Sequence, residues 1–122
     1  MKLVSDIMHK NIVGISSAAS LGSALKLMRS ANVSSLPVLN GRRLAGVLTK
    51  DVAEQNDSKD AIKSVRLKKV YLLESDSINK AAKVMEENVL SRIPVVKDGL
   101  SMQCTGMITA TEIARRIKKK IL

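Results

Sequence analysis

The sequence repeats itself, and this repeat limits the folds that the chain can adopt. Eight residues recur at one constant offset of 57 positions without a gap. The first set is Val13, Ser20, Ala24, Lys26, Met28, Ser34, Pro37 and Val38, and its partners are Val70, Ser77, Ala81, Lys83, Met85, Ser91, Pro94 and Val95. Such self-similarity indicates an internal duplication, in which both copies form the same elements and bury a shared core.

Each copy begins with the same two local signals. Apolar stretches at Ile12 to Ile15 and at Val70 to Leu73 are short enough to be buried strands. A helix follows, with Ser20 or Ser77 as its N-cap. The apolar residues of these helices recur at helical spacing and should form one face: Leu21, Ala24, Leu25 and Met28 in the first copy, and Ile78, Ala81, Ala82 and Met85 in the second.

Each copy continues with a strand that opens near a proline, at Leu36 to Leu39 and at Ile93 to Val96. Asn40-Gly41 predicts a two-residue hairpin turn, because both residue types accept a positive φ. Asp98-Gly99 predicts a longer connection in the second copy. Third strands are expected at Leu44 to Leu48 and at Thr105 to Ile108. A final helix closes each copy.

The pattern therefore predicts an α/β (α+β) fold made of two β-α-β-β-α motifs. In each motif one parallel strand pair carries an added antiparallel hairpin. Half a domain cannot bury its own sheet face, so we expect the motifs to pack sheet to sheet with pseudo-twofold symmetry. We place the first motif at residues 1–56 and the second at 57–122, as one compact module whose linker is Glu54 to Asp60.

Composition excludes several classes of function. Cys104 is the only cysteine and His9 the only histidine, so an intrachain disulfide and a usual zinc site are excluded. Cys104 is expected in the core and His9 in a surface or packing role. No nucleophile with a base and no convergent carboxylates are visible, so no enzyme is expected. Tyr71 is the only aromatic residue, which weighs against base stacking on single strands. The chain shows no membrane span and no secretory signal, so we expect a cytoplasmic protein.

Three motifs in this order resemble those of tandem CBS (cystathionine-beta-synthase) domain proteins, the Bateman modules. They are Leu36-Pro37-Val38 with Ile93-Pro94-Val95, Gly46-Val47-Leu48-Thr49 with Gly106-Met107-Ile108-Thr109, and the opening Val4-Ser5-Asp6-Ile7-Met8. The resemblance covers nearly the whole chain. It implies a regulatory module that binds AMP, ADP, ATP or S-adenosylmethionine, needs no cofactor, pairs into homodimers and regulates an attached or separate protein.

The resemblance implies a ligand site in the second motif. The family places a carboxylate for the ribose three residues after a threonine, and Thr109 is followed at that spacing by Glu112 instead of the usual Asp. Arg92 occupies a position where similar proteins carry a phosphate-binding cation. The phosphates would lie at a helix N-terminus, which favours anions. The full candidate set is Lys68, Lys69, Val70, Arg92, Ile93, Pro94, Thr109 and Glu112.

The first motif is the weaker candidate. Ser35 stands where Arg92 stands in the other copy, and Asp51 follows Thr49 one residue too early. That difference rotates a helical side chain by about 100°. The candidates here are Ile12, Val13, Ser35, Leu36, Pro37, Thr49 and Asp51.

Structural interpretations compete with these assignments. Thr109 to Glu112 also has the spacing of a capping box, and for Asp51 with Glu54 helix capping is the preferred interpretation. Arg92 has the alternative of a solvated surface residue. The functional alternatives are a structural dimerisation module and a basic nucleic-acid-binding protein. The net charge of +10 and the basic helix Ile113 to Leu122 favour phosphates, an anionic membrane surface or an acidic partner.

Overall fold

The chain forms two compact units, which divide it at positions different from those of the sequence repeat. The computed structural model describes residues 2–121, and the side chains of residues 2–116. One unit, here called the contiguous unit, is Val13–Lys69. The other, the split unit, combines Met1–Ile12 with Val70–Leu122. The N-terminal segment thus packs with the second half of the sequence, whereas the motif boundary at 56/57 stays a prediction.

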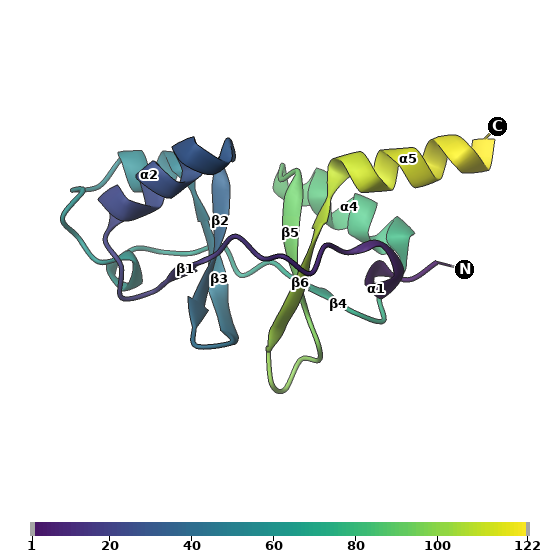
Figure 1. The fold of residues 1–122 in the computed structure, drawn as a ribbon, viewed down its shortest axis with the longest axis horizontal. Helices are drawn as coiled ribbons and strands as arrows, with labels where there is room; N and C mark the ends of the chain where they lie inside the picture. Colours follow the sequence, from purple (N-terminus) through teal and green to yellow (C-terminus); the bar gives the residue numbers. More distant parts are fainter. Residues whose placement is uncertain (1, 122) are drawn as a thin grey trace. The chain divides into compact units, whose positions relative to one another are not determined.

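The contiguous unit holds a three-stranded sheet in the order β1-β2-β3 (Figure 1). β1 (Ile15–Ser16) runs parallel to β2 (Ser35–Asn40), and β2 runs antiparallel to β3 (Arg43–Thr49). The helical elements are α2 (Leu21–Ala31), α3 (Lys50–Glu54) and the single 3-10 turn η1 (Ile62–Ser64). This confirms the predicted order of strand, helix, strand, strand and helix.

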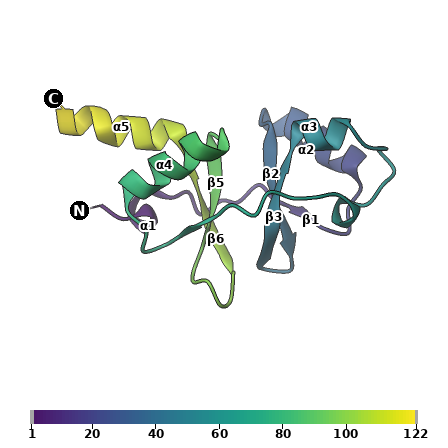
Figure 2. The ribbon, with the colours of Figure 1, turned by 180° about the vertical axis from the view of Figure 1, so that it is seen from behind.

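The split unit repeats this topology with β4-β5-β6 (Figures 1 and 2). β4 (Leu72–Leu73) is parallel to β5 (Arg92–Val96), and β5 is antiparallel to β6 (Cys104–Thr109). Its helices are α1 (Val4–Ile7), α4 (Ile78–Asn88) and α5 (Ala110–Ile121). α5 is 12 residues long, whereas its counterpart α3 has only 5.

Local sequence explains where the long helices begin and which face they bury. The side-chain oxygens of Ser20 and Ser77 each accept a hydrogen bond from the backbone N–H three residues later, as predicted for N-caps. The buried residues of the two helices recur at the predicted spacing: Leu21, Ala24 and Met28 in α2, and Ile78, Ala81 and Met85 in α4. Leu21 and Met28 belong to a core cluster that also contains Leu36 and Leu48.

Two strand predictions need correction. The apolar stretches from Ile12 and from Val70 form strand pairs only at their last residues, where β1 and β4 start. The register places Ile15 beside Val38 and Leu72 beside Val95. One residue earlier, each first strand would face a proline of β2 or β5. Proline has no backbone N–H to donate, which explains why the ladders begin after it.

The first hairpin is confirmed, but its turn lies one residue later than predicted. Asn40 pairs with Arg43 at the end of the ladder, so the two loop residues are Gly41 and Arg42. Gly41 has a φ of 61°. Glycine at the first central position is typical of the type II′ turn, which suits the twist of the two strands.

Cys104 lies in the core of the split unit, as predicted. Burial raises the pKa of its thiol, because the charged thiolate is poorly solvated there. None of the helices among the described residues is both long enough and apolar enough to span a bilayer.

Candidate functional site

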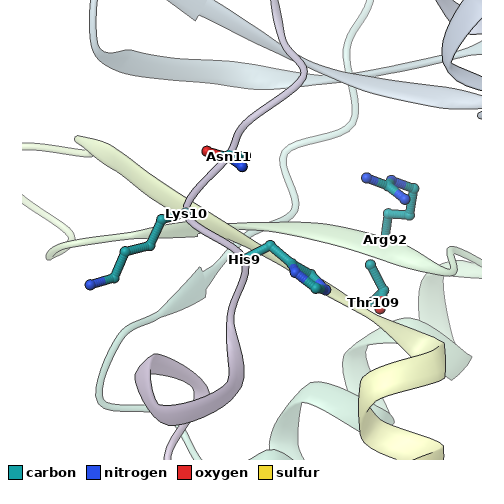
Figure 3. A pocket seen from close by; sticks show the side chains of 5 residues that line it. All are labelled: His9, Lys10, Asn11, Arg92 and Thr109. Atoms are coloured by element: carbon teal, nitrogen blue, oxygen red, sulfur yellow. The ribbon is translucent and has the colours of Figure 1, made fainter.

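A pocket of about 380 Å³ lies in the split unit, and five residues line it (Figure 3). They are His9, Lys10, Asn11, Arg92 and Thr109. Three come from the N-terminal segment and two from the β5–β6 hairpin. Residues from distant parts of the sequence therefore form one surface.

The hairpin places Arg92 and Thr109 side by side. Arg92 is the first residue of β5, Thr109 is the last residue of β6, and the two are cross-strand partners in the antiparallel ladder. Cross-strand neighbours in such a pair have side chains on the same face of the sheet. The structure thus brings together the two residues on which the second-motif prediction most depends.

Thr109 also immediately precedes helix α5, whose first residue is Ala110. The backbone N–H of Glu112 donates a hydrogen bond to Thr109 Oγ1 at 3.4 Å, which confirms the first half of the predicted capping box. In the other half Glu112 would accept from the backbone at the helix start. Instead its Oε1 lies 3.2 Å from Arg115 Nη1 and 3.9 Å from His9 Nε2. The carboxylate therefore points along the helix surface towards two cationic or titratable groups.

The N-terminal segment reaches the pocket through a pairing with β6. The backbone N–H of His9 donates to the Met107 carbonyl at 2.7 Å, and the N–H of Met107 donates to the His9 carbonyl at 2.8 Å. In Figure 3 the imidazole of His9 extends towards Thr109, whereas the side chain of Lys10 extends in the opposite direction. For His9 a surface or packing role was preferred to catalysis, and the residue was not among the predicted ligand contacts, so its place in the pocket was missed. Gly106 is the sequence feature that indicates this contact, since glycine inside a strand often marks the close approach of another backbone.

The other predicted residues of the second-motif site lie outside this pocket. Val70, Ile93 and Pro94 are buried in the split unit. Lys68 and Lys69 belong to the contiguous unit, where the Lys69 ammonium donates to the Ala45 carbonyl at 2.8 Å. Their part in a ligand site stays a prediction.

In the first motif, Ser35 and Thr49 are cross-strand partners, like Arg92 and Thr109. Ser35 is buried, and the side chain of Thr49 does not cap the helix that follows it. Asp51 lies exposed in the first turn of α3, with Thr49 at the N-cap, so the capping interpretation of Asp51 with Glu54 is wrong.

The remaining first-motif candidates are dispersed. Leu36 packs in the core cluster of the contiguous unit, Pro37 is buried in β2, and Ile12 and Val13 fall in different units. A second pocket of about 520 Å³ in the contiguous unit contains none of the first-motif candidates. It is lined by Val52, Asn56, Ser64, Val65, Arg66, Leu67 and Lys68.

The charge of the 380 Å³ pocket suits an anion. Arg92 contributes a positive charge to the lining, and the nearby carboxylate of Glu112 is already paired with Arg115. Within the part of the chain that is described, no three histidine, cysteine, aspartate or glutamate side chains gather as metal ligands. Of the predicted basic surface of the last helix, Arg115 is exposed and Arg116 is half-buried, whereas the side chains of Lys118, Lys119 and Lys120 lie outside the described residues.

The fold, the duplicated hairpins and the matching motifs define the class of this protein. The family model of the CBS domain matches residues 4–51 and 62–119. The chain therefore belongs to the CBS domain family and carries two copies of the domain.

Curated relatives include enzymes that are much longer than this chain. It is 29% identical over 121 residues to an inosine-5'-monophosphate dehydrogenase of Methanocaldococcus jannaschii, covering 97% of this chain and 24% of the relative. It is 34% identical over 125 residues to a homoserine O-acetyltransferase of Methanococcus vannielii, covering 95% of this chain and 25% of the relative. The chain thus spans about a quarter of the length of the curated relatives it matches.

Solved CBS domain structures share the fold over nearly the full chain. One is a CBS domain pair in complex with 5'-methylthioadenosine and S-adenosyl-L-methionine, with a TM-score of 0.80, 24% identity and 98% coverage of both chains. Another is CBSX2 in complex with AMP, with a TM-score of 0.82, 20% identity and 100% coverage of both chains. At these identities the likeness establishes the fold.

Proposed function

We propose that this chain is a regulatory module that binds an adenosine-containing ligand in the pocket of the split unit and performs no catalysis. One observation carries the proposal: Arg92 and Thr109 are cross-strand partners that line the same basic pocket at the start of α5. A cation, a hydroxyl and a helix N-terminus at one point are the groups that bind phosphate in proteins.

Each of these groups has a role in holding the phosphate. The guanidinium of Arg92 donates charge-assisted hydrogen bonds to phosphate oxygens. The hydroxyl of Thr109 already accepts from the Glu112 N–H, which leaves its proton to donate to the ligand. The positive end of the α5 dipole adds to the attraction.

We assign the sugar and the base to neighbouring residues. The carboxylate of Glu112, one turn into α5, would accept hydrogen bonds from the two ribose hydroxyls. For the adenine, Val70 is the remaining apolar candidate, because it keeps 7% of its surface exposed whereas Ile93 is fully buried. The binding of AMP, S-adenosylmethionine and methylthioadenosine by neighbours of the same fold supports an adenosyl ligand.

Ligand binding by such a module would act on another protein. Two relatives are named as enzymes, and this chain aligns with only 24% and 25% of their lengths. We propose that occupancy of the pocket changes an interface with an attached or separate protein, and that two copies pair as a homodimer.

The proposal is tested by thermal unfolding with AMP, ADP, ATP and S-adenosylmethionine at two salt concentrations. A ligand at a hundred times its Kd adds about 2.7 kcal/mol of stability, which raises the Tm of a domain of this size by several degrees. We expect at least one adenosyl ligand to produce this rise at both salt concentrations. A flat response to all four ligands would refute the proposal.

The same panel contains short DNA and RNA duplexes as a contrast. Phosphate contacts to a duplex release counterions, so their stabilisation falls steeply with salt. Stabilisation by a duplex alone, lost at high salt, would show that the basic charge serves nucleic acid instead.

A further inference from the structure

We propose that His9 is a titratable specificity residue of this pocket. When protonated, it strengthens the binding of phosphate-bearing adenosyl ligands and weakens that of ligands with a cationic sulfonium, such as S-adenosylmethionine. The inference rests on the proposed function, because it concerns the ligand of that same pocket.

The position of the imidazole is set by the backbone. Two hydrogen bonds to Met107 hold His9 against β6, only two residues before Thr109 in that strand. The imidazole lines the pocket with Arg92 and Thr109 and extends towards Thr109 (Figure 3). Its side chain is 52% exposed, so a proton and a ligand can both reach it.

Charged residues on α5, on β5 and on its own segment lie around the imidazole. Glu112 from α5 lies 3.9 Å from Nε2, and its carboxylate is shared with Arg115. Arg92 from β5 lines the same pocket, and Lys10 follows His9 on its own segment. A bound phosphate would add negative charge beside the imidazole, which favours the protonated form of the ring.

Histidine is the side chain whose ordinary charge change falls between pH 5 and pH 8. Protonation of His9 would therefore add a positive charge to the pocket beside that of Arg92. The extra charge attracts a phosphate and repels a sulfonium. Because the imidazole is half exposed, we expect an effect of about three- to fivefold in Kd, the size typical of solvent-exposed charge pairs.

Calorimetric titration with AMP at pH 6.0 and pH 8.0 tests this for the wild-type chain and for His9→Gln. The phosphate of AMP itself takes up a proton near pH 6, and this affects both proteins alike. The decisive quantity is therefore the ratio of the two Kd values between the proteins at each pH. We expect wild type to bind AMP about three- to fivefold more tightly than His9→Gln at pH 6.0 and about equally at pH 8.0. With S-adenosylmethionine the order at pH 6.0 should reverse.

Lys10→Gln is the matched control. It removes a charge from the adjacent position, but lysine does not titrate in this range. Any loss of AMP affinity should be the same at both pH values, so the pH dependence should remain that of wild type. Glutamine at position 9 keeps a polar side chain on an exposed site, and the backbone pairing with Met107 does not require the imidazole.

A second measurement observes the imidazole directly. His9 is the only histidine, so its ring signals in an NMR spectrum are unambiguous. By linkage, AMP should raise the pH at which the ring is half protonated, by the logarithm of the affinity ratio. Adenosine, which lacks the phosphate, should leave the pH of half protonation unchanged.

The outcomes separate this inference from the proposed function. Suppose that both proteins bind AMP with the same pH dependence and that AMP does not change the titration of the ring. The proposed role of His9 is then wrong, whereas AMP binding still supports the proposed function of the pocket. If neither protein binds any adenosyl ligand at either pH, the proposed function fails and this inference fails with it.

Discussion

His9 and Met107 exchange both of their backbone hydrogen bonds, at 2.7 and 2.8 Å, and so attach the start of the chain to β6. The contiguous unit contains the same relationship, since Lys68 and Val47 exchange both bonds at 2.9 Å. In each case a glycine, Gly106 or Gly46, stands just before the paired strand residue. The duplication therefore repeats a close approach between a strand and an irregular segment.

Gly106→Ala should disrupt this approach. A β-carbon at position 106 would lie 2.6 Å from Met8 Sδ and 2.9 Å from the His9 carbonyl oxygen. The methionine side chain can move, but the carbonyl is part of the paired backbone. We expect the free energy of unfolding to fall by about 1–3 kcal/mol, as for other overpacked sites, and AMP binding to weaken. Denaturant unfolding measures the change.

Gly99→Ala provides the control for that substitution. Nothing lies within 4 Å of a β-carbon at position 99. Its stability should stay within about 0.5 kcal/mol of wild type, the usual range for surface changes. Equal stability of the two variants would show that the N-terminal segment does not pack on Gly106.

Arg92→Ala should weaken AMP binding by about tenfold or more, because hydrogen bonds to charged groups contribute about 1.5–3 kcal/mol. Calorimetry measures the Kd. Adenosine should bind both proteins equally, since it lacks the phosphate that Arg92 contacts. Asp51→Ala, on the exposed surface of α3, should leave AMP binding unchanged. An unaltered Kd for Arg92→Ala would remove Arg92 from the site.

Glu112→Ala tests the assignment of the ribose. We expect weaker binding of AMP, with a smaller loss for 2'-deoxy-AMP, which lacks one of the hydroxyls that the carboxylate would accept. The Kd values of both ligands for both proteins form a double-mutant cycle. Equal losses for the two ligands would mean that Glu112 acts through its pairs with His9 and Arg115 and does not contact the ribose.

Cys104 should react slowly with thiol reagents in the folded protein. Its burial raises the thiol pKa, so the reactive thiolate stays scarce as the pH rises through the range in which an exposed cysteine ionises. The rate of modification at pH 8 should increase strongly once denaturant unfolds the chain. A fast reaction in native buffer would contradict the buried position at the start of β6.

Much of the fold could be predicted because its signals are local. Ser20 and Ser77 cap the helices that follow them, and the apolar spacing after each serine marks the buried face. Pro94 and Gly106 mark the paired strands of one hairpin. The pairing of Arg92 with Thr109 was not predicted, because the predicted strands began at Ile93 and ended at Ile108; the register of the ladder places the two residues opposite each other.

The first strands were harder to predict. Nothing within the stretch from Ile12 to Ile15 marks where strand pairing begins, because pairing depends on the partner strand. Only the register showed that a proline faces the residue before Ile15. Apolar residues of the same type can therefore lie inside or outside a hydrogen-bonded strand ladder.

The sequence by itself determined the duplication, the order of elements in each copy, the helix faces and the family. Tertiary structure alone decided that residues 2–12 pack with the second half, that His9 shares a pocket with Arg92, and that Glu112 turns to Arg115. Periodicity and capping involve residues a few positions apart, so they can be recognised in the sequence. Contacts between distant segments depend on how the whole backbone folds.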